Sequence, residues 1–233
     1  MLALKKSLLI VFVILVIDQT IKFWVKTTMT LGQEIHLAGN WAIIHFTENN
    51  GMAFGMQFAG DYGKLFLSLF RIIAVILLTW YLFHLSRKKE KFGVIFSFSL
   101  ILAGAIGNIL DSAFYGMMFS ESTYFDIARL FPVEGGYGTF LHGRVVDMLY
   151  FPILEGSYPH WFPFWGNQQF LFFRPVFNIA DSSITCGVLS LILFQRRFFQ
   201  AKNESETTVE SSENPTIGSP NEEPQTKQDI ESS

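Results

Sequence analysis

The residues best suited to chemistry are two aspartates at and before the last apolar run of the chain. The stretch 177–182 opens that run and carries Asn178 and Asp181, which would share one helix face because they are three residues apart. Asp147 follows two β-branched residues further upstream and is the expected partner of Asp181. Two carboxylates close together in a dry site cannot both ionise cheaply, so one keeps its proton. Such a pair supplies one acid and one base, which together could drive the attack of water on a carbonyl group.

Other catalytic chemistries have little support in the sequence. No serine lies in a Gly-x-Ser-x-Gly turn, and the five histidines do not have ligand spacing on a helix. Cys186 is the single cysteine, which excludes an internal disulfide and a cysteine-based metal site. We therefore predict that the protein uses neither a metal nor a cofactor.

A second group of polar residues allows both a structural and a functional interpretation. Asp18 and Lys22 are four residues apart, and we expect an ion pair with a structural role in which Lys22 extends outward. Asn108 and Asp111 are three apart and could join the site or only bind backbone groups across a helix bundle. An isolated acid inside a membrane segment is functional by default, although a structural hydrogen bond at a helix contact is the plain alternative.

Small residues indicate where segments approach or turn. Gly104 and Gly107 would allow close helix contact, and Asn49 with Gly51 forms a turn signal that has no catalytic weight by itself. Arg71, near the start of an apolar run, is expected to reach the outer membrane interface.

Composition places the chain in a membrane. Of its 233 residues, 50% are hydrophobic and 16% are aromatic, and the mean hydropathy is +0.32, which is too apolar for an ordinary soluble domain. The formal net charge of -3 comes from the tail 200–233, which holds eight acids against two lysines. The basic residues stand in short clusters beside apolar runs, so we expect no nucleic acid partner.

Four apolar runs predict four membrane spans, at about 7–26, 65–86, 92–113 and 176–195. The basic clusters flank these runs at Lys5 and Lys6, at 87–91, and at Arg196 and Arg197. By the positive-inside rule all three clusters are cytoplasmic, which puts both termini in the cytoplasm.

The remaining segments are two long loops on the outer side and one tail. Within 27–64, the apolar stretches near 35–37 and 42–46 predict short strands at the membrane surface. The segment 114–175 is rich in aromatic residues, glycine and proline, which favours a cap at the interface. We thus predict an all-α integral membrane protein with four transmembrane helices, a small extracytoplasmic β-cradle and an inserted aromatic-rich extracytoplasmic cap. The membrane domain covers 1–199, and 200–233 is a disordered acidic cytoplasmic tail.

The depth of the polar residues supports one shared site. With a rise of about 1.5 Å per residue, Asp18, Asp111 and Asp181 all fall in the outer half of the bilayer, with Asp111 near the outer surface. The site is therefore expected near the outer face.

Several short motifs occur together and in a fixed order along the chain. They are Asp18-Gln19 with Lys22, Asn49-x-Gly51-x-Ala53-Phe54-Gly55, Gly104-x-x-Gly107-Asn108-x-x-Asp111, Val145-Val146-Asp147, and Phe177-Asn178-x-Ala180-Asp181-Ser182. In order and topology they resemble the lipoprotein signal peptidases (signal peptidase II), over residues from about 8 to 197. The resemblance implies an aspartyl endopeptidase of the bacterial cytoplasmic (inner) membrane. It would cut prolipoproteins just before a cysteine that already bears a diacylglyceryl group.

The resemblance also assigns roles to individual residues. It implies that Asp147 and Asp181 are the catalytic dyad. It implies that the remaining motif residues bind substrate or support the dyad, namely Asp18, Lys22, Asn49, Gly51, Gly107, Asn108, Asp111, Asn178 and Ala180. Prolipoproteins and membrane lipid are the expected partners, and the protein is expected to be a monomer.

The chain departs from the family pattern in two places. Ser112 stands where the family usually has an arginine, and the segments 113–143 and 148–175 are longer than is typical. Both departures concern the surroundings of the two aspartates.

Two other classes of function remain as alternatives. A small proton- or ion-coupled transporter could use the aspartates as a relay, but the hydropathy has no inverted repeat and the cytoplasmic halves of the spans are almost entirely apolar. A purely structural membrane scaffold would leave the convergence of two acids near a helix start unexplained.

Overall fold

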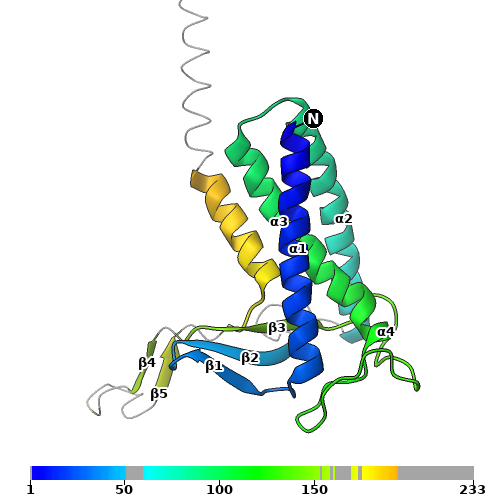
Figure 1. The fold of residues 1–233 in the computed structure, drawn as a ribbon, viewed down its shortest axis with the longest axis vertical. Helices are drawn as coiled ribbons and strands as arrows, with labels where there is room; N and C mark the ends of the chain where they lie inside the picture. Colours follow the sequence, from blue (N-terminus) through cyan, green and yellow to red (C-terminus); the bar gives the residue numbers. More distant parts are fainter. Residues whose placement is uncertain are drawn as a thin grey trace, which may run out of the picture. The chain divides into compact units, whose positions relative to one another are not determined.

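Long apolar helices make up most of the chain that the structure describes. The computed structural model describes residues 2–50, 60–152, 154–157, 160, 169–172 and 175–193. Helices α1 (Leu2–Thr28), α2 (Gly60–Arg87) and α3 (Phe92–Leu110) stand side by side (Figure 1). Many large apolar side chains on them are exposed, such as Phe12 at 64% and Phe66 at 72%. An apolar outer surface of this kind is typical of helices that face hydrocarbon rather than water.

Three of these segments are long and apolar enough to cross a membrane, within the residues that the structure describes. They are Ala3–Thr28, Leu65–Arg87 and Phe92–Met118. The third continues beyond its predicted end at 113, because α3 passes into the π-helical turn η2 (Asp111–Tyr115) and the short helix α4 (Gly116–Met118). The side chain of Asp111 is fully buried inside the bundle, and its predicted depth near the outer surface stays a prediction.

A shorter apolar helix, Ile179–Leu193, packs against α3. A Cβ atom on Gly104 would collide with the carbonyl oxygen of Ala180, and one on Gly107 would lie 2.8 Å from Oδ2 of Asp18. The close helix approach expected at these two glycines is therefore confirmed.

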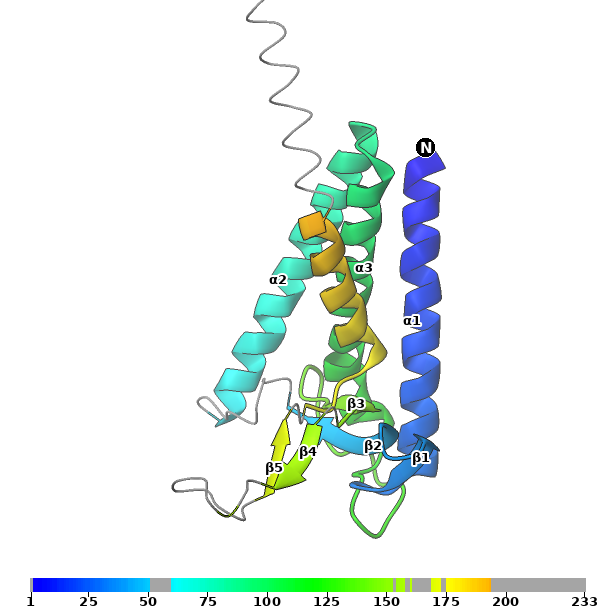
Figure 2. The same ribbon diagram turned by 90° about the vertical axis from the view of Figure 1, so that its left-hand side faces the viewer.

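A small antiparallel sheet crosses one end of the helices (Figures 1 and 2). It has the strand order β1-β2-β3, with β1 at Glu34–Ala38, β2 at Ala42–Asn49 and β3 at Val145–Tyr150. The first two strands were predicted. The third was not, because the aromatic-rich segment 114–175 was expected to form only a cap. A second pair, β4 (Leu154–Ser157) and β5 (Gln169–Phe172), also lies within that segment.

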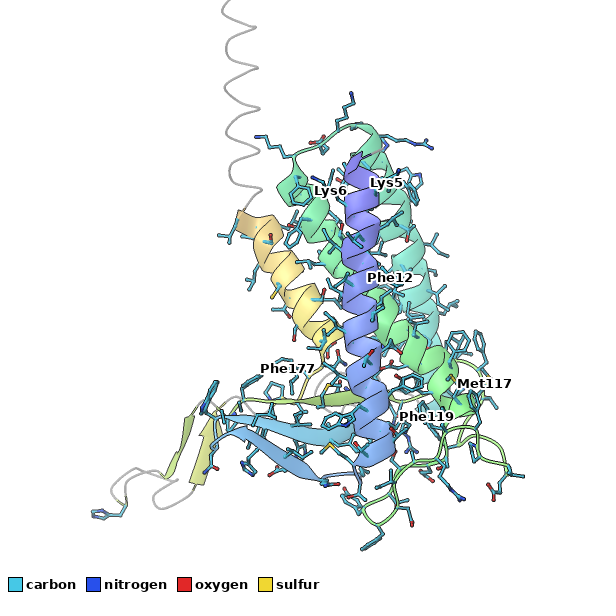
Figure 3. The ribbon with its side chains drawn as sticks, in the orientation of Figure 1. Lys5, Lys6, Phe12, Met117, Phe119 and Phe177 are labelled. Atoms are coloured by element: carbon cyan, nitrogen blue, oxygen red, sulfur yellow. The ribbon has the colours of Figure 1, made fainter. Side chains whose placement is uncertain are left out.

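The end of the bundle that carries the sheet is opposite the N-terminus. Lys5 and Lys6 lie at the far end of α1 from the sheet (Figure 3), beside the turn that joins α2 to α3 (Figures 1 and 2). An apolar cluster joins the C-terminal part of α1 to β2 and β3 through buried side chains that include Val25, Phe46 and Met148. The sheet is thereby held against the helices that carry the polar residues.

Candidate active site

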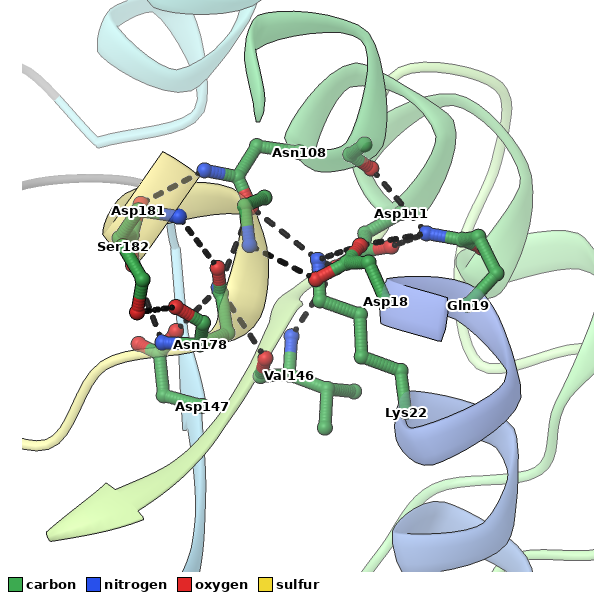
Figure 4. Close-up of polar contacts among 12 residues, drawn as sticks. Asp18, Gln19, Lys22, Asn108, Asp111, Val146, Asp147, Asn178, Asp181 and Ser182 are labelled. Atoms are coloured by element: carbon green, nitrogen blue, oxygen red, sulfur yellow. Dashed lines mark hydrogen bonds and ion pairs between the residues drawn. The ribbon is translucent and has the colours of Figure 1, made fainter. Parts of the chain in front are cut away.

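Asp147 and Asp181 come together at the end of the bundle next to the sheet (Figure 4). Asp147 is on β3, and Asp181 is in the first turn of the helix Ile179–Leu193. The side chain of Asn178 connects them. Its Nδ2 donates to Oδ1 of Asp147 at 2.7 Å, while its Oδ1 accepts from the backbone N–H of Asp181 at 2.9 Å. One amide thus binds the carboxylate of Asp147 and the backbone of Asp181, which are 34 positions apart in the sequence.

Asn178 is also the N-cap of its helix. The backbone N–H of Asn178 donates to Oδ2 of Asp181 at 3.4 Å, which completes a reciprocal pair with the bond from Asp181 to the Asn178 side chain. This is the geometry of a capping box, here built from Asn and Asp. The local signal that starts the helix therefore also sets the position of one candidate catalytic acid.

Asn108 on α3 provides a second connection. Its Nδ2 donates to Oδ1 of Asp181 at 2.8 Å, and its Oδ1 accepts from Nδ2 of Asn178 at 3.1 Å. Lys22 donates to the same Oδ1 at 3.1 Å. Because each amide end has a defined partner, the side chain of Asn108 has one orientation, and Asp181 is held from α3 as well as from its own helix.

Asp147 is the more buried of the two acids, with 4% of its surface exposed. Burial, and then the nearby charge of Asp181, raise the pKa of Asp147 to about 7, although Lys22 and hydrogen bonds from Asn178 and Asn49 oppose the shift. A carboxyl group with this pKa holds its proton through much of the range below neutral pH. The site can therefore offer an acid and a base at the same time.

A buried ion cluster lies directly beside the two acids. Nζ of Lys22 is 2.8 Å from Oδ2 of Asp18 and 2.8 Å from Oδ2 of Asp111, and all three side chains are fully buried. Gln19 donates to Oδ1 of Asp111 at 2.9 Å. The predicted ion pair between Asp18 and Lys22 is confirmed. The expected outward direction of Lys22 is wrong, because its side chain is fully buried and a second acid, Asp111 of η2, draws the ammonium group inward.

The two acids of this cluster also bind the backbone of the elements that carry Asp147 and Asp181. Oδ1 of Asp18 accepts from the N–H of Ala180 at 2.9 Å, and Oδ2 of Asp111 accepts from the N–H of Val146 at 3.3 Å. Ala180 precedes Asp181, and Val146 precedes Asp147. The cluster therefore fixes the chain next to each candidate catalytic residue.

Of the other predicted site residues, some lie at the site or at the helix contact beside it, and one lies outside the described residues. Asn49 ends β2, and its side chain hydrogen-bonds Asp147. Gly107 and Ala180 form the tight contact between α3 and the following helix. Gly51 lies outside the described residues. The functional roles of all these residues stay predictions.

Sequence reasoning did not connect Arg71 with the site. Its expected position at the outer interface stays a prediction, but its guanidinium also interacts electrostatically with Asp181, Asp147 and Asp111. Ser112 does not replace the missing cation of the family pattern, because its hydroxyl donates to the carbonyl of Asn108 in its own helix at 3.1 Å. No sequence signal linked Arg71 to Asp147 and Asp181, since both lie more than 70 positions away.

The fold and the site together define a membrane-embedded helical protein with paired carboxylates at one end of its bundle, the arrangement expected of an aspartic-type membrane hydrolase. Comparison with known proteins identifies the family. The family model for signal peptidase (SPase) II matches residues 10–197. The chain belongs to the signal peptidase II family, a family of aspartic-type peptidases.

Individual relatives agree with this assignment. The chain is 54% identical over 185 residues to a lipoprotein signal peptidase of Porphyromonas gingivalis, covering 79% of this chain and 80% of the relative. It is 37% identical over 188 residues to a lipoprotein signal peptidase of Amoebophilus asiaticus, covering 79% and 75%. A bacterial membrane enzyme solved by the in meso method at 1.9 Å has 26% identity and a TM-score of 0.53, covering 82% of this chain and 92% of its own.

The buried ion cluster gives the first testable prediction. The substitution Lys22→Met leaves Asp18 and Asp111 buried without their shared cation, so we expect the protein to lose about 3–5 kcal/mol of stability. Thermal unfolding in detergent measures this loss. The control is Lys5→Met on the same helix, where the side chain is exposed and the expected change is below about 0.5 kcal/mol. Equal unfolding temperatures for the two variants would contradict the structural role of Lys22.

Proposed function

We propose that this protein is the endopeptidase that removes signal peptides from prolipoproteins, with Asp147 and Asp181 as its catalytic dyad. The observation that carries the proposal is the amide of Asn178, which binds the carboxylate of Asp147 through its nitrogen and the backbone N–H of Asp181 through its oxygen. Because one short side chain holds both residues, their carboxyl groups lie close together, which suits a single water between them. Membership of the signal peptidase II family supplies the substrate class.

The reaction needs one proton on the dyad. With its raised pKa, Asp147 is the acid that keeps this proton, and Asp181 is the base. Asp181 takes a proton from water as the water oxygen bonds to the scissile carbonyl carbon, and Asp147 gives its proton to the carbonyl oxygen. The tetrahedral intermediate then collapses, Asp181 protonates the leaving amine, and Asp147 recovers its proton. The nucleophile is water, so no acyl-enzyme forms.

The surrounding residues keep the dyad in place. Asn108 binds Asp181, and Asn178 binds Asn108. The ion cluster of Asp18, Lys22 and Asp111 lies beside these residues and supports their positions. Asn49 and Gly51 are assigned to the substrate side of the site on the strength of the family motif. Arg71 adds a positive charge near both acids and offsets part of their mutual repulsion.

The membrane arrangement follows from the positions of the basic residues. The helix Ile179–Leu193 is assigned to a fourth span of about 176–195, with residues 1–199 as the membrane peptidase domain and 200–233 as a cytoplasmic tail. Lys5, Lys6 and the basic turn 87–91 favour a cytoplasmic location for the end of the bundle opposite the sheet. The dyad then lies near the outer face of the cytoplasmic membrane of a bacterium, and the protein acts as a monomer.

The substrate is a prolipoprotein whose cysteine already carries a diacylglyceryl group, and the cut falls just before that cysteine. Because the exposed surface of the helices is apolar, acyl chains can stay in the hydrocarbon while the peptide reaches the dyad from the side. The lipid thus holds the scissile bond near the depth of Asp181.

The dyad is tested by replacing each acid separately. We expect Asp147→Asn and Asp181→Asn each to lower kcat by at least about 10²-fold, because each removes one proton-transfer group. The assay is cleavage of a diacylglyceryl-modified prolipoprotein by purified enzyme in detergent. Both variants should insert and fold, and Asp147→Asn should unfold no earlier than the unsubstituted protein at pH 8, since the buried carboxyl is costly when it is ionised. Normal cleavage by either variant would refute the assignment.

The raised pKa of Asp147 predicts the direction of the pH dependence. Below about pH 7 the dyad holds its single proton, and above it the dyad becomes doubly ionised. We expect kcat/KM to decline as pH rises through 7 and to approach a tenfold loss per pH unit well above it. Enzyme held at pH 8.5 and returned to pH 6.5 should recover full activity. A rate that increases steadily up to pH 8.5 would show that Asp147 does not carry the required proton.

The substrate class is tested with two precursors that differ only in lipidation. We expect kcat/KM for the unlipidated prolipoprotein to be lower by at least about 10²-fold, because the remote binding energy of the acyl chains is lost. Cleavage of both precursors is followed by gel shift in the same detergent, with the lipidated form as the reference. Equal turnover of the two forms would contradict entry through the membrane.

A further inference from the structure

A second buried cluster of charges lies outside the site, among α1, β2 and the segment 119–144. We call it the outer charge network, and it consists of Lys26, Glu48, Ser122, Tyr137 and Arg144. Lys26 is fully buried, and the side chain of Glu48 is 3% exposed. The mechanism above uses none of these side chains.

Lys26 and Glu48 form the centre of the network. The ammonium group of Lys26 pairs with Oε1 of Glu48, and it donates to Oγ of Ser122 at 2.9 Å. Ser122 in turn donates to the same Oε1 at 2.9 Å, and Arg144 donates to Oε2 of Glu48 at 3.3 Å. One carboxylate therefore joins the first helix, the second strand and both ends of the segment 119–144.

Aromatic rings lie against the two cations. Nζ of Lys26 lies 5.3 Å from the ring centre of Phe119 and 5.0 Å from that of Tyr137, and the Arg144 guanidinium lies 5.1 Å from the Tyr137 ring. The backbone N–H of Arg144 also donates to the Tyr137 hydroxyl at 2.7 Å. These contacts favour a single arrangement of the network, because cations over ring faces are attracted while the rings exclude water.

The network meets the two strands right beside Asp147. In the antiparallel register Thr47 faces Asp147 and Glu48 faces Val146, while Arg144 directly precedes β3. Glu48 and Arg144 are thus the charged residues that flank the pairing of β2 with β3 at this point. A shift in either strand would move Asp147 relative to Asp181.

Lys26 follows Lys22 by four residues, so both lysines project from one face of α1. Lys22 binds one acid from α1 and one from η2, the continuation of α3, and Lys26 binds an acid from β2. The same helix face therefore sets the positions of α3 and β2 along α1. Asn108 on α3 holds Asp181, and β2 holds Asp147 through strand pairing.

Buried ion pairs add little to stability compared with apolar residues of the same size, because removing the charges from water is costly. Their best-supported benefit is a defined geometry. From the position of this network we infer that Lys26 and Glu48 are positioning residues for the peptidase reaction, which fix Asp147 against Asp181 through the pairing of β2 with β3. The inference rests on the proposed function.

The test is a double-mutant cycle on kcat. Lys26→Met, Glu48→Gln and the double variant are purified, and kcat and KM for the diacylglyceryl-modified prolipoprotein are measured per folded enzyme. Each single substitution should lower kcat about tenfold and change KM by less than about twofold, because a small displacement of the dyad slows the chemical step more than binding. The double variant should also lose about tenfold rather than a hundredfold, since both substitutions break the same connection.

Two milder variants keep the test decisive if a charge deletion does not fold. Lys26→Arg preserves the charge and the donors and should retain at least half of the kcat, whereas Ser122→Ala removes one hydroxyl and should lower kcat about threefold. Glu121→Gln is the matched control. Its carboxylate also binds Arg144, at 2.9 Å, but its side chain is 57% exposed, so we expect kcat within twofold of the unsubstituted protein.

Several results would overturn the inference. One is an unchanged kcat per folded enzyme in Glu48→Gln and Ser122→Ala, even if the unfolding temperature falls, because that outcome describes a purely structural network. Another is a double variant whose loss of kcat equals the product of the two single losses. If the unsubstituted protein itself fails to cleave the lipidated precursor, the proposed function fails, and that result is distinct from either outcome above.

Discussion

The structure depends on one lysine that is buried where three helices and a strand meet. Lys22 has no contact with solvent, and its charge is balanced by Asp18 on its own helix and by Asp111 on η2, which continues α3. Each of these acids also accepts a backbone N–H, from Ala180 and Val146 respectively. One buried cation therefore holds the start of the helix Ile179–Leu193, which carries Asp181, and the start of β3, which carries Asp147.

This constraint explains why so much charge is present in an otherwise apolar bundle. Helices in lipid have no water to drive their apolar faces together, so polar contacts and close packing determine how they associate. Here the tight contact at Gly104 and Gly107 brings α3 against the helix Ile179–Leu193, and Asn108 reaches across this contact to Asp181. The arrangement that holds the bundle together is thus also the one that arranges the site.

The sequence was sufficient to predict the contacts and strands that depend on residues close together in the chain. Spacing predicted the pair of Asp18 and Lys22, the glycine contact and the strands near 35–46. It was insufficient where the partner is distant in the chain. The direction of Lys22 depends on Asp111, 89 positions away, and the strand that carries Asp147 was hidden because its partner strand β2 is distant in the chain. The π-helical turn at Asp111 and the pairing of Lys26 with Glu48 likewise depend on tertiary contacts that no local pattern indicates.

The two acids lie in different surroundings, which affect the stability of their ionised forms. Asp181 lies in the first turn of a helix, where the unpaired N–H groups favour a negative charge, and it accepts a hydrogen bond from Asn108. Asp147 lies on a strand without that benefit and is almost completely buried, so its ionised form is the less favourable. In the proposed mechanism, a single shared proton would therefore belong on Asp147. The unequal environments of the two side chains are what the proposal uses to assign one aspartate as the acid and the other as the base.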